Sequence, residues 1–404
     1  MKAGGLVPPD VGGKIRSYHI LRELAKQHAV TVFTFYAEHP NDCHGELGPY
    51  FHRVVNVPLQ IPIPRSRGEL FHFARHLFSP LPYTVAKHAQ PQVRNAMHSL
   101  VANETFDMVV CDFAVAGAIV PWGQPCPKVL FTHNVEALLW KRHLDVAHNP
   151  IWKAVCWREY KTMARYEKRW LRAADHVLTV SETDREYFSA LIPKEKITVI
   201  PTGADTDYFR PQSAEVVANS LVFTGAMDWL PNEDGISYFV DEILPLVQRE
   251  IPDAKLVIVG RNPSARVQAL AGSSVRVTGR VADVRPYIAE GAVYVVPLRI
   301  GSGTRLKIFE AMAMAKPVVS TTIGAEGLPV RDGEHLLLAD SAAEFAKRVV
   351  ELLRNPAHGD ALGLAARQLV EQSYSWGAVT KVFSAVLERL VVQQQKIPPL
   401  INAD

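Results

Sequence analysis

A short run of residues in the C-terminal half of the chain has the composition of a phosphate-binding loop: Gly301, Ser302, Gly303, Thr304, Arg305 and Lys307. An apolar run precedes this loop and a helix-favouring run follows it. The free backbone amides and the positive dipole end of that helix would therefore face the loop. The glycines would let a phosphate approach the backbone, and the basic side chains would neutralise it. This spacing indicates a site for a diphosphate.

Glu310 lies about two turns into the same expected helix. A carboxylate at this place could accept hydrogen bonds from both hydroxyls of a ribose. The alternative is an ordinary glycine-rich turn followed by a solvated glutamate, and the spacing alone leaves both open. A GxxxxGK[ST] loop is absent, and no third glycine follows at the spacing of a dinucleotide fingerprint.

His133 is the second candidate because it directly follows an apolar run at residues 129–132. Asp112 ends another apolar run, at residues 108–112. The carboxyl ends of parallel strands share one edge of a sheet, and ligands bind there. His133 is therefore predicted to face a ligand, with Asp112 as a base or as a group that orients the imidazole.

Short apolar runs alternate with helical patterns along the whole chain, which is typical of parallel α/β architecture. We predict two Rossmann-like, doubly wound domains that face each other across a cleft. The expected strands are residues 30–36, 54–58, 108–112, 129–132, 177–180, 197–200, 221–224, 256–259, 275–278, 293–297 and 318–321. A turn-rich stretch at 201–219 marks the boundary. The expected parts are an acceptor domain (1–205), a donor domain (206–380) and a C-terminal helix (381–404) that crosses back to the first domain.

The composition is that of an ordinary soluble protein, with 404 residues, 48% hydrophobic and 21% charged. A net charge of +3 suits a phosphate-bearing substrate but is too small to indicate nucleic acid. The four cysteines form no CxxC pair, and the histidines show no zinc spacing. No signal peptide or membrane span is evident, so we expect a cytoplasmic protein that touches a membrane at most peripherally.

Two segments combine aromatic and basic residues, at 62–90 and 151–174. We interpret both as amphipathic surfaces whose aromatic side chains face the core. The alternative is contact with a membrane or an acceptor, since basic and aromatic surfaces bind anionic headgroups.

The run EAMAMAKPVVS, from Glu310 to Ser320, is similar to the EAMAxGxPVV signature of the family 4 retaining glycosyltransferases, which have the GT-B fold. The likeness extends over nearly the whole chain. IPTGADTDYF at 200–209 resembles the family's linker, and VTGRV at 277–281 resembles a strand and its turn. PPDVGG at 8–13 resembles the glycine-rich loop after the first strand, and THNVE at 132–136 resembles the active-site histidine segment.

The resemblance implies a role for each matching residue. Gly12 and Gly13 would lie near the donor phosphates and the acceptor, and His133 would contact the transferred sugar. The phosphate site would consist of Gly301, Ser302, Gly303 and Thr304, with Arg305 and Lys307 neutralising the leaving diphosphate. Glu310 would bind the ribose, and Arg280 and Val281 would lie in the base-binding loop.

The chain departs from the family pattern at several places. Ser302 stands where a second glutamate is usual, eight positions before Glu310, and Ala315 replaces a glycine. The usual Arg/Lys pair is missing from residues 224–232, where Arg305 and Lys307 could substitute with Asn232 as a polar contact. The first strand is almost absent from residues 1–7, so either the true start lies upstream or the sheet lacks a central strand.

Taken together, these residues predict transfer of a sugar from a nucleotide diphosphate sugar, most simply a UDP-sugar, to a glycan or lipid-linked acceptor. The resemblance implies retention of configuration, and no metal or other cofactor is expected. Asp205 and Asp207 form a DxD triplet, which we interpret as turn capping rather than a metal site. Two alternatives remain: a sugar-nucleotide 2-epimerase, and a non-catalytic nucleotide-sugar-binding member of a polysaccharide assembly complex.

Overall fold

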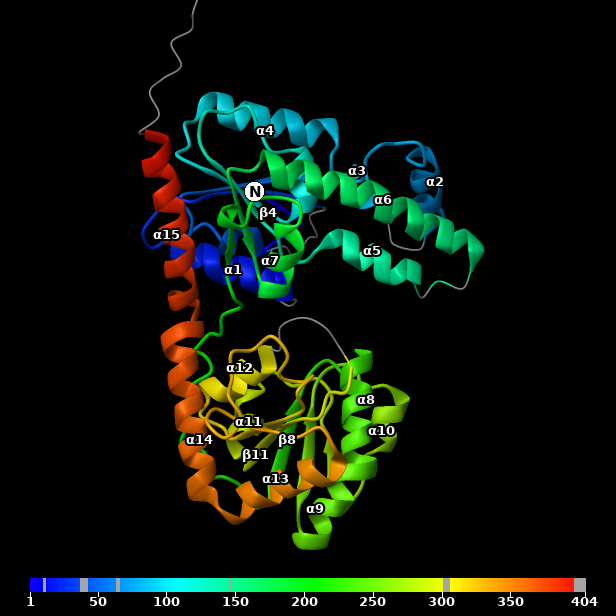
Figure 1. Ribbon diagram of the computed structural model, residues 1–404, viewed down its shortest axis with the longest axis vertical. Coiled ribbons are helices and arrows are strands. Elements are labelled where there is room, and N and C mark those ends of the chain that lie inside the picture. The colour runs from blue at the N-terminus through cyan, green and yellow to red at the C-terminus, as the bar shows by residue number, and fades with distance from the viewer. Residues whose placement is uncertain are drawn as a thin grey trace, which may run out of the picture. The chain divides into compact units, whose positions relative to one another are not determined.

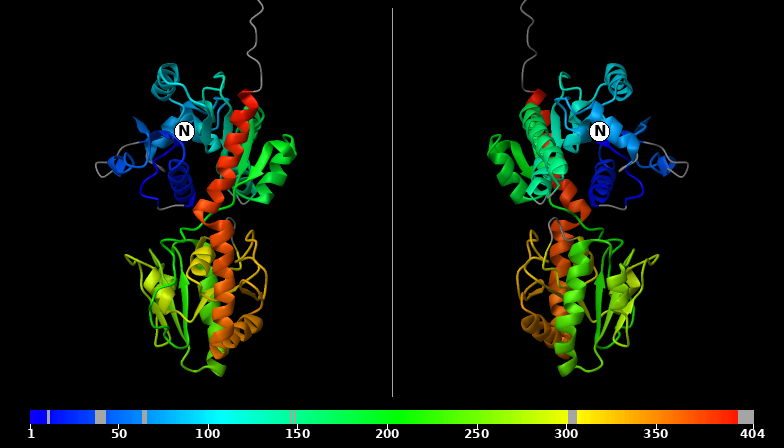
Figure 2. Two further views of the ribbon diagram at one scale, coloured as in Figure 1. Left: turned by 90° about the vertical axis from the view of Figure 1, so that its left-hand side faces the viewer. Right: turned by 90° about the vertical axis from the view of Figure 1, so that its right-hand side faces the viewer.

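The computed structural model describes residues 1–9, 12–36, 43–62, 66–145, 147, 149–300 and 306–395. Contacts divide the chain into two compact units. Unit 1 is Met1–Pro201 together with the chain from Thr380 onward, and unit 2 is Thr202–Val379. Each unit contains one parallel sheet covered by helices on both faces (Figures 1 and 2).

Unit 1 is built on seven parallel strands in the order β3-β2-β1-β4-β5-β6-β7. These strands are β1 (Lys2–Ala3), β2 (Thr31–Tyr36), β3 (Arg53–Pro58), β4 (Val109–Asp112), β5 (Lys128–Phe131), β6 (His176–Thr179) and β7 (Ile197–Val199). The helices are α1 (Gly12–Leu24), α2 (Arg67–Arg75), α3 (Tyr83–Ala86), α4 (Pro91–Asn103), α5 (Glu136–Asp145), α6 (Pro150–Ala173) and α7 (Glu182–Ser189). Short 3-10 turns are η1 (Cys43–Glu46), η2 (Ala114–Ala118) and η3 (Lys194–Lys196).

Unit 2 is built on six parallel strands in the order β10-β9-β8-β11-β12-β13. These strands are β8 (Ser220–Thr224), β9 (Lys255–Val259), β10 (Val275–Val277), β11 (Val293–Val296), β12 (Val318–Ser320) and β13 (Leu337–Leu338). The helices are α8 (Leu230–Tyr238), α9 (Leu244–Glu250), α10 (Ala265–Ala269), α11 (Arg285–Glu290), α12 (Leu306–Ala313), α13 (Ala342–Arg354) and α14 (Pro356–Leu369), with π turns η4 (Phe239–Ile243) and η5 (Val370–Tyr374). The last helix, α15 (Trp376–Gln395), is shared between the two units.

Continuous apolar runs become strands that are buried on both faces. Every residue of β8, β11 and β12 is buried, and so is every residue of β6 in unit 1. Alternation of apolar and polar residues is lost in such strands because helices cover both sides. The predicted α/β class and the Rossmann-like sheets are confirmed.

Three elements differ from the prediction. The sheet of unit 1 does have its central strand, although β1 has only two residues, and it pairs with both β2 and β4. A short strand, β13, extends the sheet of unit 2. The helical pattern after Gly235, which by itself indicates a helix over residues 235–249, belongs to a helix that begins at Leu230 and contains the π turn η4 just before Pro245. The π turn forms there because proline has no amide hydrogen to continue the regular ladder.

Helix α15 begins in unit 2 and continues into unit 1 from Thr380. Within unit 1, the Phe383 ring packs edge-on against Phe131 at 5.4 Å, and Ser384 lies 2.9 Å from a ring nitrogen of His28. The last part of this helix is therefore a packed element of unit 1. Among the described residues, no helix has the length and apolar content needed to cross a bilayer.

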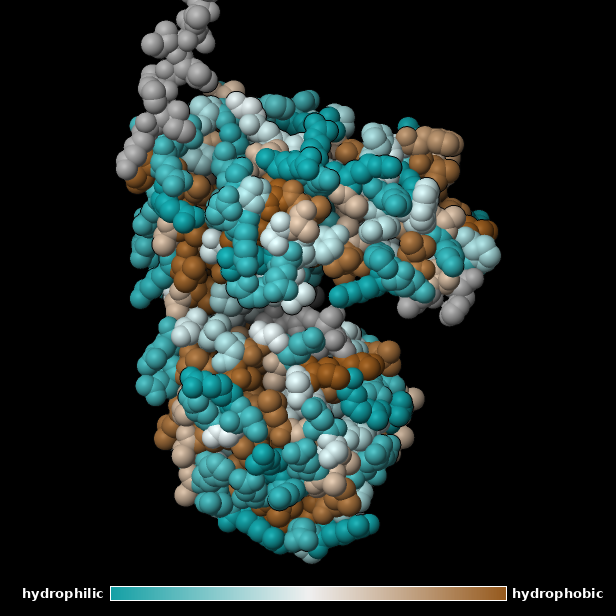
Figure 3. Space-filling view, viewed as in Figure 1, coloured by the Kyte–Doolittle hydropathy of each residue, from teal (hydrophilic) through white to brown (hydrophobic). Residues whose placement is uncertain are grey.

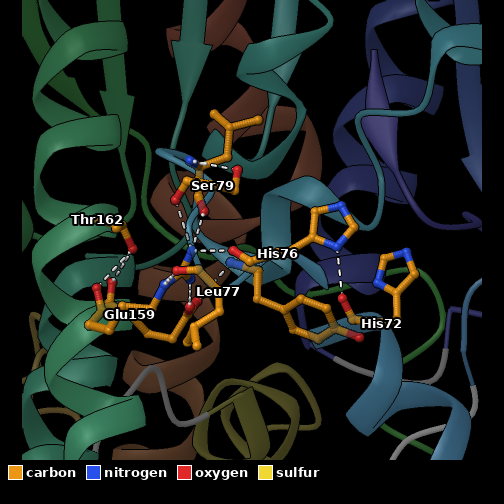
Figure 4. A network of polar contacts seen from close by, with 9 residues as sticks. His72, His76, Leu77, Ser79, Glu159 and Thr162 are labelled. Carbon is orange, nitrogen blue, oxygen red and sulfur yellow. Dashed lines mark hydrogen bonds and ion pairs between the residues drawn. The ribbon is translucent and has the colours of Figure 1, made fainter. Parts of the chain in front are cut away.

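A single arginine of α6 holds the chain between α2 and α3 in unit 1 (Figure 4). The Arg158 guanidinium donates hydrogen bonds to the carbonyls of His76 (2.7 Å), Leu77 (3.0 Å), Ser79 (2.8 Å) and Leu81 (3.3 Å). The adjacent Glu159 pairs with Arg158 and accepts the Tyr83 amide at 2.8 Å. Glu159 is fully buried, so this pair replaces solvent for a loop that has few apolar contacts of its own.

We predict that Arg158→Ala loosens this loop. Four carbonyls lose a charged donor, so the free energy of unfolding should fall by about 3 kcal/mol or more, and limited proteolysis should cut between residues 75 and 82. Arg165→Ala, an exposed position on the same helix, is the matched control. Equal proteolysis of the two variants would show that Arg158 does not hold the loop.

Candidate functional site

The carboxyl ends of β8 and β11 lie side by side at the centre of the unit 2 sheet. After β8 the chain continues to β9, which lies on the side of β8 away from β11. After β11 it continues to β12, which lies on the side of β11 away from β8. The connections after these two strands therefore diverge, which creates the crevice where doubly wound sheets bind ligands. The loop after β8, the start of α8 and the start of α12 all reach this edge.

Lys307 and Asn232 meet at this edge from different helices. The Lys307 amino group donates to the Asn232 side-chain oxygen at 2.6 Å and lies 4.2 Å from the centre of the Phe223 ring. The Asn232 side-chain amide in turn donates to the Ala226 carbonyl at 2.8 Å. The polar contact expected of Asn232 is thus a bridge that fixes a lysine next to the end of β8.

Gly225 makes room for this arrangement. A Cβ added there would lie 2.8 Å from the Lys307 Nζ and 2.7 Å from the Asn232 Nδ2. Both side chains would have to move away. The glycine directly after β8 is therefore part of the site.

Glu310 lies one turn after Lys307 on α12 and is half-buried, not solvated. Burial raises the pKa of Glu310 to about 7, although the charge of Lys307 acts in the opposite direction. Glu310 also acts electrostatically on the buried Tyr294, whose hydroxyl lies 2.5 Å from the Thr224 hydroxyl. A carboxylate whose charge is poorly compensated at the ligand edge of a sheet is a typical functional group.

The remaining predicted donor-site residues have mixed outcomes. Gly301, Ser302, Gly303, Thr304 and Arg305 lie outside the described residues. Their predicted roles stay predictions, as does the effect of serine in place of the usual glutamate.

Arg280 and Val281 follow β10, after Gly279, whose φ is +69°. Arg280 is exposed, and Val281 packs partly against the core. Another basic residue, Arg299, follows β11 but is held by Asp234 at 2.7 Å.

In unit 1, His133 and Asp112 lie together at the carboxyl ends of β5 and β4. The His133 Nε2 is 2.6 Å from the Asp112 carboxylate, and the Nδ1 is 3.0 Å from the Arg16 guanidinium. The expectation that Asp112 orients His133 is confirmed. His133 is only 5% exposed and stacks on Phe113 at 3.9 Å.

These contacts define the protonation state of His133. Arginine can only donate, so the Nδ1 must accept and the Nε2–H donates to Asp112. Burial lowers the pKa of His133 to about 4, although Asp112 acts to raise it. Burial would raise the pKa of Asp112, but Lys2 and His133 hold it well below its usual range. His133 is therefore neutral, and both ring nitrogens are used within unit 1.

Gly12 and Gly13 begin α1, which carries Arg16 to His133. A Cβ added at Gly13 would lie 2.6 Å from the Phe113 ring, whereas one at Gly12 would meet nothing within 4 Å. Gly13 thus permits close packing on Phe113, and Gly12 is the exposed member of the pair.

Sequence reasoning missed several members of these two clusters. Lys2 lies 3.5 Å from the Asp112 carboxylate, donates to Ser17 and lies over the Phe113 ring at 4.0 Å. The sequence does contain a signal for Lys2, because a lysine within the otherwise uncharged segment of residues 1–7 indicates a charged group with a specific role. Tyr294 gave none, since an aromatic residue in a buried strand is ordinary.

The described part of the chain contains no group of three or more His, Cys, Asp or Glu side chains arranged to hold a metal. Asp205 accepts the Tyr208 amide at 2.9 Å, so its predicted turn-capping role is confirmed. Ser181 likewise caps α7 through the Asp184 amide at 3.1 Å.

Two family models match the chain, one over each unit. The model described as Glycosyltransferase Family 4 matches residues 12–208, and the model described as Glycosyl transferases group 1 matches residues 218–355. Both descriptions agree with the resemblance found in the sequence.

Individual proteins are also similar to this chain. An uncharacterised 44.6 kDa protein from the cps region of Klebsiella pneumoniae is 23% identical over 74% of this chain and 78% of its own length. The phosphatidyl-myo-inositol mannosyltransferase of Mycobacterium leprae is 29% identical over 54% of this chain, and the match spans 60% of that enzyme. The structure of Anabaena HepE in complex with UDP and glucose has a TM-score of 0.64 at 14% identity, covering 96% of this chain and 98% of that one. The chain belongs to the family 4 and group 1 glycosyltransferases, which are transferase enzymes with the GT-B fold.

Proposed function

We propose that this chain transfers a sugar from a nucleotide diphosphate sugar, bound by unit 2, to an acceptor bound by unit 1. The observation that carries the donor assignment is the arrangement of Lys307, Asn232 and Glu310 at the carboxyl ends of β8 and β11. The family assignment supports it at the level of the reaction.

Lys307 is proposed to stabilise the departing nucleotide diphosphate. Negative charge accumulates on the β-phosphate as the bond to the sugar breaks. A cation fixed before the reaction lowers the barrier without reorganisation. Asn232 is a positioning residue in this proposal because it holds the amino group through its side-chain oxygen. Arg305 would add a second cation, as its place in the sequence predicts.

Glu310 is proposed to accept hydrogen bonds from the ribose hydroxyls. Its raised pKa means that the unliganded protein carries this group partly protonated near pH 7. A ribose would supply two donors to the ionised form and so favour ionisation on binding. The base-binding role of Arg280 and Val281, and the phosphate-binding role of residues 301–304, complete the donor proposal.

His133 remains the proposed contact to the transferred sugar, with Gly12 and Gly13 nearby. Since Asp112 and Arg16 occupy both ring nitrogens, sugar contact through nitrogen would require one of these bonds to exchange. Otherwise His133 acts as a positioning residue that accepts a hydrogen bond from Arg16 and stacks on Phe113.

The proposed donor is a UDP-sugar, supported by the UDP bound in the similar HepE structure. The proposed acceptor is a glycan or a lipid-linked glycan, supported by the name of the mannosyltransferase relative. We further propose that transfer retains the anomeric configuration, requires no metal or other cofactor, and takes place in the cytoplasm at the membrane surface.

The first of three predictions from the proposed function concerns pH. Because the pKa of Glu310 is about 7, about a tenth of the groups are ionised at pH 6 and about nine tenths at pH 8. Nucleotide affinity should therefore rise about tenfold between these values. The effect of Glu310 on folding stability has the opposite pH dependence. Because the pKa of Glu310 is raised in the folded protein, the folded state is favoured at low pH, and this stabilisation is lost as the pH rises through 7.

Isothermal titration with UDP, repeated on Glu310→Gln, checks this prediction. The titration of the UDP phosphates affects the affinity of both proteins equally. The part of the pH dependence that comes from ionisation of Glu310 should be absent in the variant. Identical pH profiles for the two proteins would remove Glu310 from the ribose site.

The second prediction concerns Lys307 and Asn232. Lys307→Met should lower kcat about 100-fold or more, and Asn232→Leu should lower it less because the amino group stays but loses its anchor. The double variant should be no worse than Lys307→Met alone, because both act through one contact. Lys347→Met, on the exposed face of α13, is the control. Additive losses in the double variant would mean that Asn232 acts independently.

The third prediction separates the two roles of His133. If the imidazole contacts the sugar, His133→Gln should lower kcat about 100-fold while Asp112→Asn leaves a clearly higher rate. If His133 only positions Arg16 and Phe113, both variants should lower the melting temperature and kcat together. Initial rates and thermal melts of the same preparations distinguish these outcomes.

A further inference from the structure

The apolar side of α2 faces solvent. Leu70 and Phe71 of α2 are 70% and 67% exposed, and Leu77 and Phe78, in the turn that follows it, are 44% and 95% exposed. None of the nine residues of α2 is buried. An amphipathic helix of a globular unit normally turns such a stripe toward the core. The interpretation that the aromatic residues of this segment face the core is therefore wrong for Phe71 and Phe78, whereas Phe73 is half-buried and Tyr83 is buried.

The opposite side of α2 fixes this orientation. His72 and Phe73 pack edge-on against the Tyr83 ring at 5.6 Å and 5.1 Å. The following turn is bound to Arg158 through the His76 and Leu77 carbonyls. Figure 4 shows Leu77 and Ser79 gathered beside Glu159 of α6. The exposure of the apolar stripe is thus imposed by specific contacts.

The start of α6 continues the apolar surface. Ile151, Trp152 and Trp157 are 77%, 47% and 56% exposed. Trp157 directly precedes Arg158, which binds the loop that contains Phe78, so the two segments adjoin. Figure 3 shows hydrophobic residues on the part of unit 1 where α2 and the start of α6 lie. We call these seven residues of α2, its following loop and α6 the docking surface.

Basic residues accompany this surface along α6. The helix contains seven lysines and arginines, and its two glutamates, Glu159 and Glu167, are buried. Lys161, Arg165 and Lys168 follow Trp157 along the exposed side. Exposed aromatic and aliphatic groups beside a row of cations, on a helix whose own glutamates are buried, are complementary to an anionic lipid surface, where the apolar groups insert and the cations remain among the headgroups.

We propose that the docking surface binds unit 1 to the face of a bilayer that contains anionic lipids. Phe71 and Phe78 enter the interface, the exposed tryptophans lie at headgroup level, and the basic row of α6 contacts lipid phosphates. This surface goes beyond sugar transfer, since it needs neither donor nor acceptor. It would bring the enzyme to a lipid-linked acceptor.

Cosedimentation with vesicles tests the proposal without any substrate. The full chain should bind vesicles of phosphatidylglycerol and phosphatidylcholine (1:1) about tenfold or more tightly than pure phosphatidylcholine, with weaker binding at high salt. Phe71→Asp with Phe78→Asp should lower the affinity at least tenfold, and so should Lys161→Gln with Lys168→Gln. All four positions are exposed, so the variants should melt like the parent protein.

Matched controls come from unit 2. Leu364→Asp changes a side chain that is 63% exposed on α14, and Arg266→Gln with Lys347→Gln removes the same charge from exposed positions. Both should bind vesicles like the parent protein. On binding, the tryptophan emission should shift to shorter wavelength, and Trp157→Phe should reduce that shift.

Three results would overturn the proposal. One is failure to bind anionic vesicles at all. A second is equal loss of binding in the unit 2 controls. The third is concentration-dependent dimerisation that Phe71→Asp abolishes while lipid binding is absent, which would assign the surface to a second copy of the chain. Sugar transfer to a water-soluble acceptor should persist in the docking-surface variants, so failure of this proposal is distinguishable from failure of the proposed function.

Discussion

The amino group of Lys307 is held beside the carboxyl end of β8 by contacts of three different kinds. The Asn232 oxygen accepts its hydrogen bond, the Phe223 ring lies below it, and Gly225 leaves the space that it occupies. A free lysine side chain has about 2 kcal/mol of rotamer entropy to lose. Here folding has already restricted that freedom, so a phosphate would meet a charge that is in place. The usual basic pair after β8 is absent, and this lysine from α12 occupies the region instead.

The two clusters handle buried charge in opposite ways. In unit 1, Asp112 lies between Lys2 and His133, and His133 lies between Asp112 and Arg16, so each charged or polar group has a partner. In unit 2, burial raises the pKa of Glu310 to about 7 because nearby groups compensate its charge only in part. A ligand that donates hydrogen bonds to Glu310 can offset the free-energy cost of burying its charge. The charged and polar groups of the unit 1 cluster already have partners, so a ligand would stabilise them little further. The donor assignment therefore has the stronger physical basis.

Most of the fold could be predicted because many strands are continuous apolar runs, as in β8, β9 and β11. The strand β1 could not, since two residues carry no periodicity and are strands only through pairing with β2 and β4. For the site, Lys307, Asn232, Glu310 and His133 were identified from motif position. Asp112 was expected to orient His133, but Arg16 and Lys2 were not identified, because Lys2 and Asp112 are 110 positions apart in the chain and nothing local connects them. The helical period of α2 also gives no sign of which side faces inward.

The exposed stripe of α2 follows from a competition between polar and apolar contacts. Rotating the helix would bury Phe71, and a large apolar side chain gains about 1.5–3 kcal/mol on full burial. Rotation would also release the carbonyls that Arg158 binds and leave the buried Glu159 without its loop contact. Each buried polar group left without a partner costs about 1–3 kcal/mol, so the polar anchor can outweigh the burial of one ring. The arginine that orders this loop is therefore also the group that keeps the apolar side chains of the docking surface turned outward, so the proposed membrane contact depends on the folding of unit 1.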